Sequence, residues 1–188
     1  MFELLAAAAM GLISGTFLTL MDRIDEHRIV QRHRAFLAYL AATATAASMA
    51  WSIEQFPVLY PFLLGLCVEW IIKDKIDFPS HVFFLFLLTL YFGWRIDLLW
   101  QYAPYIVLFL AVRYVSGTML RRKLGGKPGF FRWYYASYWE KFVCDIMLAI
   151  ALSSLPIIVY AAGFTVACLY TKRLLPEKSN KLDAPCPT

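Results

Sequence analysis

The cationic side chains of this chain fall into a few short stretches that alternate with long apolar runs. Fifteen of the eighteen Lys and Arg residues lie within residues 23–34, 73–75, 121–132 and 172–181. The apolar runs between these stretches are close to the roughly 20 residues that a membrane-spanning helix needs. In membrane proteins, Lys and Arg collect in the loops on the cytoplasmic side. The pattern therefore predicts an all-α polytopic membrane bundle.

The composition supports a bilayer as the solvent. Hydrophobic residues make up 61% of the chain and charged residues 16%, against about 45–50% and about 25% in soluble domains. The net charge of +5 is explained by membrane topology, so we expect no nucleic-acid partner. The four cysteines are scattered singly, which indicates neither a redox centre nor a zinc site.

Seven apolar segments are long enough to be candidate transmembrane helices. They are residues 1–21, 35–51, 56–72, 82–100, 103–120, 134–152 and 155–171. Pro156 follows a Ser-Ser-Leu break, which favours a hairpin over one long final helix. Seven spans place every basic stretch on one side, with the N-terminus outside and the C-terminus cytoplasmic. Six spans plus a re-entrant piece is the alternative.

The boundaries define one transmembrane domain, residues 1–173, and a tail, residues 174–188, that we expect to be disordered. The charge pattern favours a multi-pass protein of the plasma (inner) membrane. Phe and Tyr residues crowd the fourth segment, which we expect to face lipid.

Small residues recur at intervals of four on two of the segments. Ala7, Gly11 and Gly15 form one such face, and Gly163 with Ala167 repeats the spacing on the last segment. Such faces allow membrane helices to approach closely. We expect the face to pack within the chain, with a partner helix joining through Gly11 and Gly15 as the alternative.

Three ionisable residues lie away from the ends of their predicted spans, where charge is costly. They are Glu69, Arg113 and Asp145. An intramembrane ionisable residue is by default a hypothesis of function, with a partner to be named. We expect Arg113 to face Asp145, with Glu69 as a second acceptor. The network is either a structural pair that fixes helix register or a path for a polar substrate or proton.

Two further charged residues, Arg95 and Asp97, lie near the end of the fourth predicted span. Residues two apart on a helix face different directions. We therefore expect separate partners for them and a role as an anchor at the membrane interface.

Acidic pairs follow the first and third segments on the cytoplasmic side. Asp22 and Asp25 form one pair, and Asp74 and Asp77 form the other. If the two loops meet, four carboxylates can bind Mg²⁺, which prefers oxygen ligands and often bridges to phosphates. The adjacent glycine-rich basic loop could then bind a phosphate or diphosphate through Arg121, Arg122, Lys123 and Lys127. The alternative is that both loops are simply solvated.

These observations leave three functional hypotheses. The first is a small transport or membrane-complex component that uses Glu69, Arg113 and Asp145. The second is a Mg²⁺-dependent membrane enzyme acting on a phosphate- or diphosphate-bearing lipid at the cytoplasmic face, where an anionic headgroup would bind. The third is a structural subunit. The sequence implies no cofactor outside the enzyme hypothesis.

Overall fold

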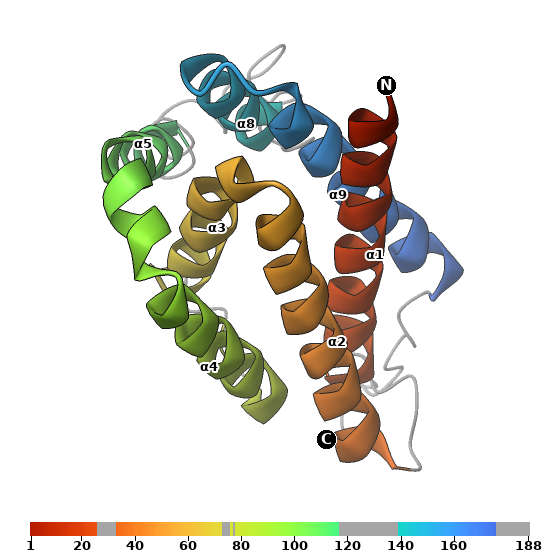
Figure 1. The fold of residues 1–188 in the computed structure, drawn as a ribbon. Coiled ribbons are helices and arrows are strands. Elements are labelled where there is room, and N and C mark those ends of the chain that lie inside the picture. The colour runs from red at the N-terminus through yellow and green to blue at the C-terminus, as the bar shows by residue number, and fades with distance from the viewer. Residues whose placement is uncertain (26–32, 73–75, 77, 117–138, 176–188) are drawn as a thin grey trace, which may run out of the picture.

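The computed structural model describes residues 1–25, 33–72, 76, 78–116 and 139–175, with the side chains of the last range described from Phe142 onward. These residues form seven α-helices and one short 3₁₀ turn (Figure 1). The elements are α1 (Phe2–Asp25), α2 (Arg34–Gln55), η1 (Pro57–Leu59), α3 (Tyr60–Ile72), α4 (Pro79–Trp94), α5 (Ile96–Tyr114), α8 (Trp139–Ala151) and α9 (Leu155–Leu174). The predicted all-α fold is confirmed, because each of the seven predicted segments contains a helix.

The helices differ in length. Within the described residues, α1, α2, α5 and α9 are long and apolar enough to cross a membrane. The apolar stretches Pro57–Ile72, Pro79–Trp94 and Phe142–Ala151 are shorter. A helix rises about 1.5 Å per residue against a hydrocarbon core of about 30 Å. Four helices are therefore long and apolar enough to span a membrane, while the crossing of the other three stays a prediction.

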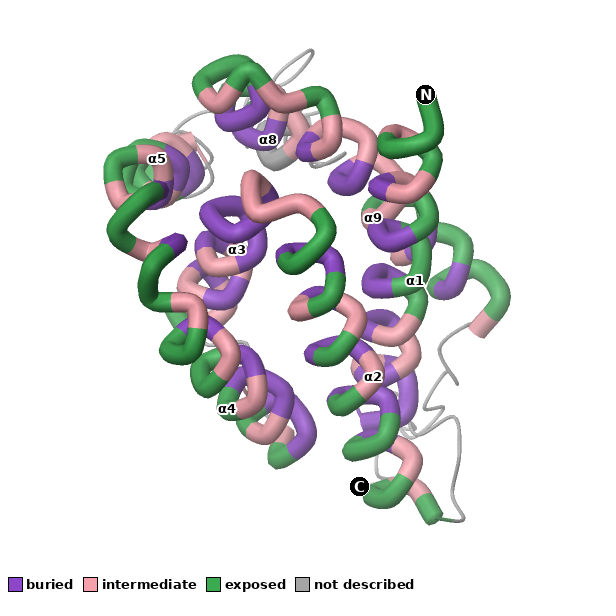
Figure 2. Tube along the Cα trace, in the orientation of Figure 1, coloured by how far each residue is buried: buried purple, intermediate pink, exposed green. Residues whose placement is uncertain are grey.

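In Figure 1, α3 lies between α2 on one side and the α4–α5 pair on the other. The α1 helix packs against both α9 and α2, and α4 packs mainly on α2. The α5 helix packs on α3, and α8 contacts both α5 and α9. Buried residues line the inward faces of these helices, while exposed residues lie on the outside (Figure 2). The core is therefore shared by the first, middle and last parts of the chain.

The tightest helix crossing is that of α1 with α9, and it depends on glycine. A methyl group on Gly15 would lie 2.5 Å from the carbonyl oxygen of Phe164. A methyl group on Gly163 would lie 2.6 Å from the carbonyl oxygen of Ala8. Gly11 meets the carbonyl oxygen of Tyr160 in the same way. The small-residue face is thus filled by α9 of the same chain, as the within-chain prediction requires.

The α4–α5 boundary differs from the predicted spans 82–100 and 103–120. The chain leaves the helix at Arg95, which has φ −100° and ψ 42°, so α4 ends at Trp94 and α5 begins at Ile96. The sequence interpretation kept Arg95 inside a span because the surrounding residues are apolar. At this break, the Arg95 guanidinium contacts the Glu54 carboxylate on α2.

The hairpin between α8 and α9 is confirmed. The α8 helix ends at Ala151, and α9 begins at Leu155 with a proline in its first turn. Ser153 adopts the left-handed conformation, with φ 49°. Its amide donates to the carbonyl oxygen of Ile150, at 3.0 Å. This tight turn allows the two helices to pack against one another.

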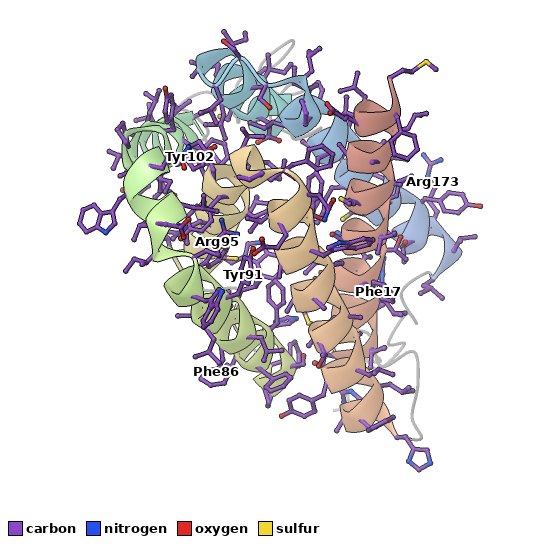
Figure 3. All side chains as sticks on the ribbon, in the orientation of Figure 1. Phe17, Phe86, Tyr91, Arg95, Tyr102 and Arg173 are labelled. Carbon is purple, nitrogen blue, oxygen red and sulfur yellow. The ribbon has the colours of Figure 1, made fainter. Side chains whose placement is uncertain are left out.

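The prediction that the fourth segment faces lipid is only partly right. Phe84 and Phe92 on α4 are buried in the core, whereas Phe86 is 56% exposed and points outward (Figure 3). Aromatic density alone did not distinguish the two faces, since α4 carries aromatic residues on both of them.

Candidate functional site: a buried charge network

Three helices bring one guanidinium and two carboxylates together inside the bundle. The Nη2 atom of Arg113 lies 2.6 Å from Glu69 Oε2. The Nη1 atom of Arg113 donates a hydrogen bond of 2.9 Å to Asp145 Oδ1. We call Glu69, Arg113 and Asp145 the Arg113 network. The predicted pairing of Arg113 with Asp145, and its second contact with Glu69, are both confirmed.

The three side chains come from different helices. Arg113 lies in the last turn of α5, and Glu69 lies three residues before the end of α3 at Ile72. Asp145 lies six residues from either end of α8, which is about 9 Å at 1.5 Å per residue. All three residues are buried, with exposures of 6–8%. The network therefore couples α3, α5 and α8 at a site closed to the surface.

An aromatic ring lies beside the guanidinium. The Cζ atom of Arg113 lies 5.1 Å from the centre of the Phe109 ring, within the range of a cation–π interaction. Gly65 makes room for that ring, because a methyl group there would lie 2.6 Å from Phe109 Cε1. Phe109 and Gly65 thus belong to the site, although the sequence interpretation missed them. The sequence did hold a signal for Phe109, because it lies four residues, or about one helical turn, before Arg113.

The electrostatics of the network depend on its burial. Charged groups inside a membrane protein are expensive unless they pair with one another. A guanidinium presents a planar fork of donors that suits carboxylates, and here two of its nitrogens hold carboxylates from separate helices. Arg113 can keep one carboxylate while the other is protonated or moves. The network is therefore a buried cation shared by two acids from two helices.

A second charged cluster lies at the α4–α5 corner, and we call it the Arg95 network. Arg95 Nη1 donates a 2.6 Å hydrogen bond to Glu54 Oε2, and Arg95 Nε donates one of 3.3 Å to Asp97 Oδ1. The Tyr91 hydroxyl donates to Glu54 Oε1, at 2.8 Å. Tyr91 and Arg95 lie on the side of α4 that faces α2 (Figure 3).

The Arg95 network corrects the prediction of separate partners for Arg95 and Asp97. That prediction assumed that both residues lie on one helix. Because Arg95 is the non-helical corner, the two side chains can meet. Glu54, which the sequence interpretation missed, is the third member. It gave no signal in the sequence, because a glutamate near a helix end is ordinary.

Of the four aspartates predicted to bind Mg²⁺, two lie in the described residues. Asp25 accepts a hydrogen bond from the Ser80 hydroxyl and forms an ion pair with Arg34. Asp22 Oδ1 lies 3.3 Å from His81 Nε2. The end of α1 therefore meets the first turn of α4, where Ser80 lies three residues after Asp77 in the sequence. Asp74 and Asp77 themselves lie outside the described residues.

The metal and phosphate predictions remain untested. Among the residues that the structure describes, no group of three or more His, Cys, Asp and Glu side chains could hold a metal ion. The proposed phosphate-binding residues Arg121, Arg122, Lys123 and Lys127 lie outside the described ranges. The two described aspartates, Asp22 and Asp25, contact residues on α2 and α4.

Comparison of the chain with protein-family models, with curated proteins and with solved structures gives no match.

Proposed function

We propose that this chain is a small multi-pass membrane transport component that moves protons, alone or together with a solute, through the Arg113 network. The observation that carries the proposal is that Arg113 holds Glu69 and Asp145 at once, through two different nitrogens. A register-fixing ion pair needs one acid. With two acids from two helices, the guanidinium can stay paired with one acid when the other loses its charge.

The proposed mechanism is an exchange of carboxylate partners. When a proton binds Asp145, that carboxyl group loses its charge, and its attraction for Arg113 weakens while Glu69 retains the guanidinium. Loss of that proton to the other side restores the original pair. Because the partners lie on α3 and α8, each exchange also changes the force between these helices. A solute carried with the proton would use that helix movement.

The proposed orientation follows from the basic stretches. With the N-terminus outside and the C-terminus cytoplasmic, the C-terminal ends of α1, α3 and α5 would lie at the cytoplasmic side, where cations are favoured. Glu69 and Arg113 lie near the ends of α3 and α5, so the Arg113 network would be nearer the cytoplasm. The plasma (inner) membrane is the proposed location.

Proton flux into liposomes tests the proposal. The purified chain is reconstituted with a pH-sensitive dye inside, and a potassium diffusion potential drives protons inward. We expect a flux well above that of empty liposomes, and its loss in the Arg113→Gln/Asp145→Asn double variant. Asp145→Asn alone leaves Arg113 paired with Glu69, so it tests function in a protein that keeps its fold.

The matched control is the Arg95→Gln/Asp97→Asn double variant, which removes the same two charges from the exposed network. It should retain the wild-type flux. A wild-type flux no faster than empty liposomes would overturn proton transport. Unchanged flux in both Arg113 network variants would leave a structural role for these residues.

A further inference from the structure

A small cavity lies where five helices of the bundle meet. Its volume is about 40 Å³. The α3 helix contributes three of the lining residues, Leu66, Cys67 and Trp70, and α1, α2, α4 and α9 contribute one side chain each. We call this space the α3 cavity.

The lining of the α3 cavity is apolar. Beside Cys67, it consists of leucine, methionine and aromatic side chains, and a buried free cysteine behaves as a small hydrophobic residue. The Trp70 ring packs against that of Phe84 on α4, with ring centres 5.8 Å apart. Apolar cavities stay dry, and one of about 150 Å³ binds benzene or xenon in place of water. The smaller α3 cavity therefore suits an apolar molecule that is smaller than benzene.

The cavity and the Arg113 network lie against different faces of the same helix. Gly65 and Glu69, four residues apart on α3, contact Phe109 and Arg113 of α5. Leu66 and Trp70 each follow one residue later, and adjacent residues on a helix point about 100° apart. Among the described residues that line the cavity, none comes from α5 or α8. The free space thus lies on a side of α3 that the network does not occupy.

Free space beside α3 matters because protein interiors are closely packed and deform little. The partner exchange proposed above changes the force on α3 through Glu69. A helix that is packed on every side cannot respond to such a change by moving. The α3 cavity leaves this helix room to shift, and a molecule that fills the cavity would remove that room.

We propose that the α3 cavity binds one small apolar molecule, of the size of xenon or dioxygen, and that an occupied cavity blocks the shift of α3 during carboxylate exchange. The binding site stands without the proposed function, whereas the effect on transport rests on it. The bound molecule is held by filling space and by contact with apolar side chains. It therefore acts as an inhibitor that touches none of the charged residues.

Xenon and fluorine NMR test the binding site. The wild-type chain is labelled with fluorinated tryptophan in detergent, and the Trp70 signal is assigned by its loss in Trp70→Phe. We expect this signal to shift with xenon pressure and to saturate. Trp94, which is 83% exposed, is the control for xenon dissolved in the detergent. A Trp70 shift that does not saturate, or that is no larger than the Trp94 shift, would overturn the site.

Cys67→Met tests whether the space can be filled from within the chain. Methionine is flexible and fits irregular gaps, so we expect loss of the xenon shift and a melting temperature about 2–4 °C higher. Cys144→Met is the matched control. Cys144 on α8 is also buried, with 3% exposure against 7% for Cys67, and it does not line the cavity. There the larger side chain should lower the melting temperature, as overpacking does. An equal decrease in both variants would show that no usable space exists beside Cys67.

The effect on transport is tested with the same variant in the liposome assay. We expect Cys67→Met to lower proton flux at least tenfold although it stabilises the fold. Gly93→Ala is the control, because an added methyl group there meets no atom within 4 Å and favours the helix, and it should keep the wild-type flux.

Xenon gives the same test without a substitution. Saturating xenon should reduce the wild-type flux, and degassing should restore it, with the leak of empty liposomes measured under the same pressure. Wild-type flux in Cys67→Met, or in the xenon-saturated protein, would overturn the effect on transport. If the wild type carries no flux, the proposed function fails, and the fluorine spectra still decide the binding site.

Discussion

The two arginine networks use the same chemistry at opposite ends of α5, and they differ in burial. Arg113 and its carboxylates have side-chain exposures of 6–10%. In the Arg95 network, the carboxylates of Glu54 and Asp97 are 45% and 63% exposed. Exposed ion pairs contribute little, because water and salt screen them. A buried pair is costly to break, because the remaining charge has no water around it. We therefore expect the buried Arg113 network to contribute more to the stability of the bundle than the exposed Arg95 network.

The largest effect that the comparison predicts is that of Arg113→Gln. This change leaves two buried carboxylates without the guanidinium that holds both. We expect a loss of about 3–5 kcal/mol in the free energy of unfolding, as for other buried pairs that lose one partner. Unfolding monitored by circular dichroism in mild detergent gives the measurement. A loss no larger than that of Arg95→Gln would remove the distinction between the two networks.

Asp145→Asn should have a smaller effect than Arg113→Gln. Arg113 retains Glu69, and the asparagine side chain can still accept a hydrogen bond. We expect a loss of about 1.5–3 kcal/mol, the range for a hydrogen bond to a charged group. The same unfolding assay applies, with Asp97→Asn as the matched acid-to-amide control. If Asp145→Asn were as damaging as Arg113→Gln, Glu69 would contribute nothing to holding the guanidinium.

Arg95→Gln should cost far less than either change in the Arg113 network, and its effect should depend on salt. At 1 M ionic strength the screening length falls to about 3 Å, so wild type and variant should approach one another in stability. The difference made by Arg113→Gln should persist in the same buffer. Unfolding at low and high sodium chloride separates the two cases. A salt-independent Arg95→Gln effect would show that the corner is buried in the membrane state.

Tyr91→Phe is expected to give the smallest effect. It removes one hydrogen bond to Glu54, which is exposed and keeps its contact with Arg95. Thermal melts of the variant should overlap those of the wild type within error. A clear destabilisation would mean that Tyr91 positions Glu54 and that the Arg95 network acts as a unit.

The sequence predicted the fold well where apolar length and turn residues decide it. Seven segments, the hairpin near Ser153 and the pairing of Arg113 with two acids all follow from hydropathy and from the cost of buried charge. The α4–α5 break at Arg95 did not, because the residues around it are apolar and the partner Glu54 lies 41 residues away in the sequence.

The glycine crossing of α1 and α9 also has a consequence for biosynthesis. Gly15 and Gly163 are separated by 148 residues, which a ribosome translates in roughly 7–30 s at 5–20 residues per second. During that interval α9 is absent, so the small-residue face of α1 lacks the helix that covers it in the folded chain. We expect a chain that stops before Leu155 to associate through this face, seen as a cross-linked dimer that Gly15→Leu abolishes. We therefore expect α9 to shield this face of α1 from association with a second chain.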